Sequence, residues 1–164
     1  MNITQDNAVK TKGFFRLQIV THNEDGTSEI TSDSGFKPNQ IVNNGYDYFL
    51  ARVVASQTGS LFVSHAALGT GTVPGSAATT LPGELTDAAG CRCAVSSSTT
   101  GSKTAQFTFN LASNVITAAR TIANVGLFTG STTSAGTMMS GNTYASSALA
   151  TNQSVSGTYQ IQFA

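Results

Sequence analysis

Hydrophobic residues occupy every second position in several stretches of the chain, which is the pattern of strands with one buried face. Near the N-terminus Phe15, Leu17 and Ile19 form such a run, which ends in Asn23-Glu24-Asp25-Gly26. An Asp-Gly pair supplies the positive φ that a tight hairpin turn needs. The pattern therefore predicts a strand up to this turn and a returning strand over residues 28–31.

The same alternation recurs in the second half of the chain. Phe107, Phe109 and Leu111 alternate with polar residues, and a similar run from Val155 to Phe163 reaches the C-terminus. Glycine, serine and threonine clusters separate the strands with no helical pattern between them, which favours an antiparallel β-sandwich or jelly roll over a parallel sheet. Weaker strands are predicted over residues 61–68, 91–96 and 121–128. A further strand is predicted at Met138, with a partner strand near Tyr144 across a turn at Ser140-Gly141-Asn142.

One segment has a helical period instead. Apolar residues recur at i, i+3, i+4, i+7 and i+8 from Tyr46 to Val54. Asn43 or Asn44 can cap the first turn, and Thr58-Gly59 offers a stop. We therefore predict one short amphipathic helix, at about residues 44–56, that packs its apolar side against one end of the sandwich.

The 164 residues suit one domain of ordinary size. Residues 1–12 are polar and have no period, which predicts a flexible N-terminal arm that orders on a neighbour, or a frayed end. Residues 13–164 are predicted to form a single β-sandwich domain. The start has no apolar core typical of a signal peptide, and no apolar run approaches the ~20 residues that span a bilayer, so we expect no membrane association.

Charge is sparse and unevenly placed. Charged residues make up 10 % of the chain, and eight basic residues balance eight acidic ones. A balance of this kind does not attract nucleic acid or an anionic membrane surface. Every acidic residue lies at or before Asp87, and the remainder is rich in serine, threonine, alanine, glycine and asparagine. Such a composition indicates either an ordinary solvent-facing β-surface or a surface that packs against neighbours, and low net charge favours a protein that is assembled with others.

No residue pattern indicates a catalytic, cofactor or metal site. The glycine-rich stretch from Gly69 to Gly75 lacks the lysine of a phosphate-binding loop, and Gly-x-Ser-x-Gly does not occur. His22 and His65 do not have zinc-site spacing relative to the cysteines. We therefore predict that the chain is not an enzyme and holds no cofactor.

The two cysteines flank a single residue. In an extended strand, residues two apart have Cα atoms about 6.5 to 7 Å apart, at or beyond the limit for a disulfide. Cys91 and Cys93 are therefore predicted to be buried free thiols, with an intermolecular bond as the open alternative.

Several short segments together resemble a known group of proteins. These segments are Ile41-Val42-Asn43-Asn44-Gly45 before the predicted helix, Ala67-Leu68-Gly69-Thr70-Gly71-Thr72, Thr80-Leu81-Pro82-Gly83-Glu84-Leu85, Val125-Gly126-Leu127-Phe128 and the alternating C-terminal strand. Their order is similar to that in small virion structural proteins of tailed bacteriophages, of the capsid cement (decoration) or tail and fibre type. The similarity spans about residues 41–163 and departs at Asn124, where an acidic residue is expected.

The resemblance implies a β-sandwich that forms a homo-oligomer, a dimer or a trimer, and binds other shell proteins without performing chemistry. The implied partner is the major capsid protein or another virion protein, and the implied location is the capsid surface of the virion, assembled in the host cytoplasm. The expected contact surfaces are the loops from Thr70 to Leu81 and from Thr129 to Thr137, and tolerated insertions are the alternative. The candidate interaction residues in these loops are Thr70, Thr72, Val73, Pro74, Ser131, Thr132 and Thr133.

Two other functions stay open on the sequence. One is a tail, collar or fibre component that adheres to a host glycan or to another tail protein. The other is a carbohydrate-active hydrolase, which needs a pair of carboxylates in a cleft, with Glu84 and Asp87 as the residues to test.

Overall fold

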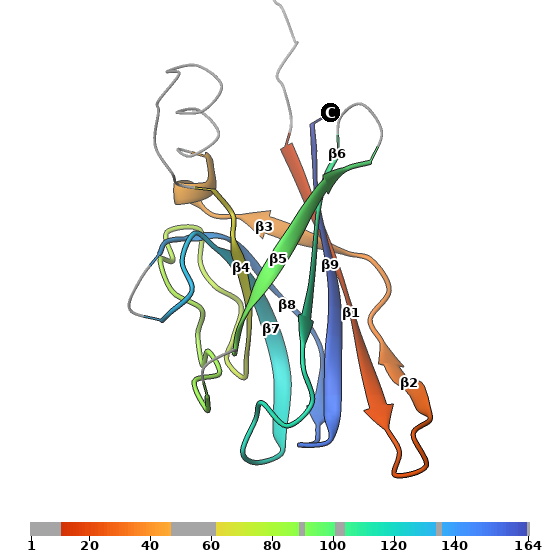
Figure 1. Cartoon of the computed structure of the whole chain (residues 1–164). Helices are drawn as coiled ribbons and strands as arrows, with labels where there is room; N and C mark the ends of the chain where they lie inside the picture. Colours follow the sequence, from red (N-terminus) through yellow and green to blue (C-terminus); the bar gives the residue numbers. More distant parts are fainter. Residues whose placement is uncertain (1–10, 47–61, 89–90, 101–103, 134–135, 164) are drawn as a thin grey trace, which may run out of the picture.

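The chain folds into antiparallel β-structure, as the alternating pattern predicts. The computed structural model describes residues 11–46, 62–88, 91–100, 104–133 and 136–163. All strand pairings among these residues are antiparallel (Figure 1). The strands are β1 Thr11–His22, β2 Ser28–Asp33, β3 Lys37–Ile41, β4 His65–Gly69, β5 Arg92–Thr99, β6 Thr104–Leu111, β7 Arg120–Phe128, β8 Met138–Leu149 and β9 Gln153–Phe163.

The sheet closes on itself, and this differs from the predicted sandwich. The strand order is β2-β1-β3-β8-β7-β4-β5-β6-β9, and β1 also pairs with β9. Eight strands therefore form a barrel, and β2 lies outside the closed ring. Closure depends on two strands that change partner along their length: β3 passes from β1 to β8, and β5 passes from β4 to β6. Because these two strands join the two halves of the sheet, the edges of a separate sandwich are lost.

The barrel interior is built from the alternating residues. Phe15, Leu17 and Ile19 of β1 are buried, and Tyr159 and Ile161 of β9 face the same core. Phe109 and Leu111 are buried as predicted, whereas Phe107 is half-buried and packs at the margin of the core. The C-terminal strand therefore lies inside the sheet, between β1 and β6.

The predicted turn at residues 140–142 is wrong, because β8 runs without interruption through it. Gly141 lies opposite Gly126 of β7. A Cβ atom at Gly141 would lie 2.9 Å from the ring carbon Cγ of Pro74. This glycine therefore permits a loop to approach the strand closely, and it does not mark a turn.

No pattern in the sequence predicts β3, which begins next to Pro38 and has only five residues. Its position is secured by side chains instead. Ser140 donates to the carbonyl oxygen of Gln40 over 2.8 Å, and its hydroxyl oxygen accepts from Asn39 at 2.6 Å and from the Tyr159 hydroxyl at 2.8 Å. Burial raises the pKa of Tyr159, so the phenol stays protonated and keeps its donor.

The predicted end of the N-terminal arm and the predicted start of the helix both need correction. Thr11 and Lys12 belong to β1 and pair with β9, so the arm does not extend to residue 12, and residues 1–10 lie outside the described residues. Residues 43–46 are helical, so the helix starts one position before the predicted range. The rest of the predicted helix, 47–56, lies outside the described residues.

Candidate interaction face

The connection between β4 and β5 folds back along its own first residues. The Thr70 amide donates to the Gly83 carbonyl over 2.9 Å, and the Gly71 amide donates to the Pro82 carbonyl over 3.1 Å. A Cβ at Gly71 would lie 2.5 Å from the Pro82 carbonyl oxygen, so only glycine permits this approach. Gly83 has a φ of +63°, a conformation that also favours glycine. The glycine-rich loop is therefore held in place by backbone hydrogen bonds between its first residues and residues 82–83.

This loop covers the outer face of the barrel and creates a second hydrophobic core there. Ala66 and Leu68 of β4 face the barrel interior, whereas Ala67 faces outward. Leu81 of the loop covers Ala67 together with three other buried side chains. The five buried members of this outer core are Val42, Ala67, Leu81, Phe128 and Met138. Four of the five come from the four internal segments that carry the family resemblance.

Asn124 ties the loop to β7. It is fully buried, and its Nδ2 donates to the carbonyl oxygens of Thr72 over 3.0 Å and of Pro82 over 2.8 Å. An acidic residue was expected at this position from the resemblance. A carboxylate only accepts hydrogen bonds and would face two carbonyl oxygens here, whereas an amide donates to both. The departure from the family pattern therefore fits this loop.

A buried ion pair joins this loop to its neighbour. Arg92 of β5 donates to Glu84 through Nε at 2.5 Å and through Nη2 at 3.0 Å, and the two side chains are 2 % and 8 % exposed. The Nη1 atom donates to the Gly130 carbonyl over 3.1 Å, and the guanidinium lies 3.8 Å from the centre of the Phe128 ring. Buried charges require partners, so this arrangement holds the 84–88 segment against the 129–133 loop.

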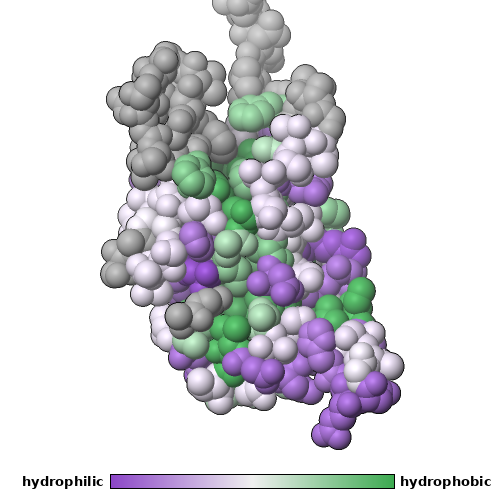
Figure 2. All heavy atoms as spheres, in the orientation of Figure 1, coloured by the Kyte–Doolittle hydropathy of each residue, from purple (hydrophilic) through white to green (hydrophobic). Residues whose placement is uncertain are grey.

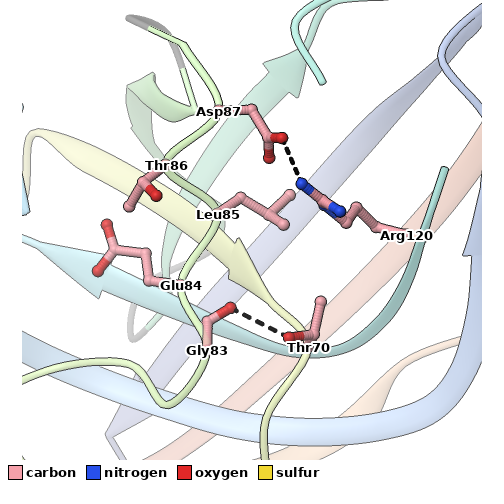
Figure 3. Close-up of a pocket in the computed structure, with 7 residues that line it drawn as sticks. All are labelled: Thr70, Gly83, Glu84, Leu85, Thr86, Asp87 and Arg120. Carbon is pink, nitrogen blue, oxygen red and sulfur yellow. Dashed lines mark hydrogen bonds and ion pairs between the residues drawn. The ribbon is translucent and has the colours of Figure 1, made fainter. Parts of the chain in front are cut away.

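A second ion pair lies on the other side of the same segment. Asp87 accepts from Arg120 over 2.6 Å and from the Thr117 hydroxyl over 2.8 Å, and these contacts lower the pKa of Asp87. Figure 3 shows Asp87 turned toward Arg120 and Glu84 turned away from both. The two carboxylates are therefore held by different arginines and do not form a shared acid pair.

Two shallow cavities flank this segment, and both are lined by Leu85 and Thr86. The first has a volume of about 330 Å³, and the second has a volume of about 210 Å³. Hydroxyl groups line both cavities beside the two ion pairs. The first is lined further by Thr70, Gly83, Glu84, Asp87 and Arg120 (Figure 3), and the second by Ala88, Cys91, Arg92, Ser131, Thr132 and Thr133.

The structure brings most of the predicted interaction residues to this one surface, which we call the loop face and define as residues 70–73, 83–88 and 130–133. Both connections lie on the left of the barrel in Figure 1, and the surface there is mostly pale in Figure 2. The exposed members of the predicted set are Thr70, Thr72, Val73, Ser131, Thr132 and Thr133. Pro74 is buried against Gly141, so its side chain is not part of this exposed surface.

Sequence reasoning did not assign a structural role to the three residues that fix the loop face, which are Glu84, Arg92 and Asn124. Only Arg92 carried a local signal, because an arginine between two cysteines in a strand with buried neighbours must find a buried partner. Glu84 shows its role only through Arg92 of the next strand, and Asn124 shows its role only through Thr72 and Pro82, which lie 52 and 42 residues before it.

Both cysteines are buried, as predicted, and they do not form a disulfide with each other. Burial, and then the neighbouring Cys91, raise the pKa of Cys93 to about 12, so its thiolate is scarce at neutral pH. Among the described residues, no group of three or more histidine, cysteine or acidic side chains is placed to hold a metal ion. A helix long and apolar enough to cross a membrane is not found in the described part of the chain.

Comparison with protein-family models, with curated proteins and with solved structures found no match to this chain.

Proposed function

We propose that this chain is a structural protein of a tailed-bacteriophage virion, a cement protein that binds the assembled capsid shell through the loop face. The observation that carries the proposal is the outer core. Four segments that resemble phage virion proteins meet there and hold a long polar loop on the barrel. The two halves of the barrel, joined through β3 and β5, serve as the rigid double layer that was predicted as a sandwich.

The composition of the loop face suits adhesion. Its exposed side chains are mainly threonine and serine, and its two carboxylates, Glu84 and Asp87, are already paired with Arg92 and Arg120. Such a surface binds through hydroxyl and backbone hydrogen bonds and needs no opposite charge on its partner. Because the loop is already ordered, little conformational entropy is lost on binding. Many copies on one shell then convert modest contacts into strong retention.

Nothing in the loop face favours the hydrolase alternative. A glycosidase needs one carboxylic acid with a raised pKa beside a second carboxylate. The pKa of Asp87 is lowered, and Glu84 is engaged by Arg92 on the opposite side of the segment. We therefore propose a binding function without catalysis.

Heat resistance of the shell tests the proposal. Purified chain is added to particles that lack it, and shell disruption is followed with temperature or chaotrope concentration. A ligand that binds only the assembled shell stabilises it, so saturating chain is expected to raise the disruption temperature. Absence of protection at full occupancy contradicts the cement role.

A pair of variants assigns the effect to the loop face. Thr86→Arg places a charged side chain between the two cavities, and Ser98→Arg makes the same change at an exposed position of β5. We expect Thr86→Arg to abolish protection while the Ser98→Arg variant protects normally. A few bound copies at one vertex, in place of many over the shell, support the tail, collar or fibre alternative.

A further inference from the structure

The wall of the barrel is incomplete beside β2. One edge of β1 pairs with β9, and the other edge pairs with β3 through residues 13–15 and with β2 through residues 18–22. The next strand around the barrel is β8, which β3 reaches and β2 does not. In the described residues, β2 and β8 are joined here by a single side-chain hydrogen bond, between the hydroxyls of Ser32 and Ser147 at 3.1 Å.

The outer edge of β2 therefore has no strand partner among the described residues. Figure 1 shows β2 beside β1 at the right-hand margin, with no further strand beyond it. A strand edge of this kind presents backbone donors and acceptors that can pair with another extended chain. Ile30, in the middle of β2, is 58 % exposed and adds an apolar contact.

The charge on the β1–β2 hairpin indicates which kind of partner segment can pair with the outer edge of β2. Three of the described acidic residues form ion pairs with arginines, and one of these is Asp33 with Arg16. The others, Glu24, Asp25 and Glu29, form no ion pair within the described residues and all lie on the β1–β2 hairpin, where hydrophilic atoms gather at the lower right of Figure 2. Pairing of two copies through β2 would bring these like charges together, so a second copy is disfavoured.

We propose that the outer edge of β2 is a strand-addition site for an extended, lysine- or arginine-bearing segment of a partner protein. Backbone hydrogen bonds to β2 supply the affinity, and Glu29 with the hairpin carboxylates selects cationic side chains. Ile30, which follows Glu29, points to the other side of the strand, so alternating cationic and apolar residues match this edge. The site is separate from the loop face and does not depend on its function.

The test uses the full chain and two capped heptapeptides, one alternating lysine with valine and one alternating glutamate with valine. Amide hydrogen exchange across the chain is measured by NMR with each peptide. We expect the lysine peptide, at about 1 mM, to slow exchange of β2 amides roughly tenfold, and the glutamate peptide to have no effect. Glu29→Gln is expected to weaken this protection, whereas Ser98→Lys, with the same change in net charge, leaves it unchanged.

Four results overturn the proposal. If neither peptide protects β2, the acidic side chains and the bulge in the β1–β2 pairing serve only to prevent unwanted pairing. If both peptides protect it equally, or if Glu29→Gln has no more effect than Ser98→Lys, charge does not select the partner. Protection spread over the whole barrel reports general stabilisation and also contradicts a site at β2.

Discussion

The loop face and the β1–β2 hairpin are stabilised by similar residues but differ in how deeply those residues are buried. An arginine–carboxylate pair stabilises each of them: Arg92 with Glu84 at the loop face, and Arg16 with Asp33 at the hairpin. Arg92 and Glu84 are almost completely buried, whereas Arg16 and Asp33 are about one-third exposed. The loop face also has its own hydrophobic core, whereas the hairpin has a free strand edge and an exposed isoleucine.

This difference shows where the chain depends on tertiary contacts. The long loop has little regular secondary structure, so its shape depends on the outer core, Asn124 and the buried ion pair. The hairpin is held by the strand pairing of β1 and β2, and its ion pair is open to water. Exposed pairs are screened by water and contribute little, whereas breaking a buried pair leaves an uncompensated charge.

The largest expected effect is loss of the whole fold, which includes both regions. Ile161→Asp places a carboxylate in the barrel core, where the residue is 2 % exposed, and is expected to unfold the chain. Phe107→Asp is expected to destabilise it less, because Phe107 is only half-buried. Circular dichroism and chemical denaturation measure both. A folded Ile161→Asp protein would show that the register of β9 is wrong.

Breaking the buried ion pair is expected to destabilise the chain more than breaking the exposed one. Arg92→Met leaves Glu84 buried without its partner, which costs about 3–5 kcal/mol in the free energy of unfolding. Arg16→Met is the matched control at the exposed pair and is expected to change the denaturation midpoint only slightly. Equal losses in the two variants would contradict the distinction between these pairs.

Asn124→Asp tests the tether between the loop and β7. The new carboxylate faces the carbonyls of Thr72 and Pro82, so we expect a loss of about 2–3 kcal/mol at neutral pH. Because a protonated acid can again donate one hydrogen bond, the loss is expected to shrink as the pH falls. Denaturation at several pH values measures this dependence. A variant as stable as the parent at neutral pH would show that the tether does not hold the loop.

The smallest effect concerns Asp87. Its pKa in the folded chain lies below the ordinary value of 3.8, so the folded state binds this proton less readily than the unfolded state does. The resulting stability is present above about pH 4 and is lost as the pH falls through the folded pKa. Asp87→Asn is therefore expected to lower stability at neutral pH by under about 1 kcal/mol and to flatten its acid dependence. An unchanged slope between pH 5 and about pH 2 would exclude this carboxylate as a source of the dependence.

Local pattern was sufficient for much of the fold. The alternation at Phe15, Leu17 and Ile19 predicts a strand with one buried face, and the structure confirms it. The turn at Asn23–Gly26 is also confirmed, since the Gly26 amide donates to the Asn23 carbonyl and Gly26 has a positive φ. Both features depend only on neighbours in the chain.

Features that depend on distant residues were not predictable in this way. The pattern around Gly141 is typical of a turn, and only the approach of Pro74 explains a glycine within a strand. Closure of the barrel depends on β3 and β5 changing partner, and the hydrogen bonds that hold β3 join Asn39, Ser140 and Tyr159. The loop face was predicted as exposed polar loops, but Glu84, Arg92 and Asn124, which hold it in place, lie in different segments.

A density map of tailed-phage particles assembled in the presence of this chain tests the proposed cement function most directly. We predict the barrel in many copies on the outside of the shell, with residues 70–73, 83–88 and 130–133 against a neighbouring protein. Copies bound with that surface turned to solvent, or particles in which the barrel is absent from the shell, would contradict the account.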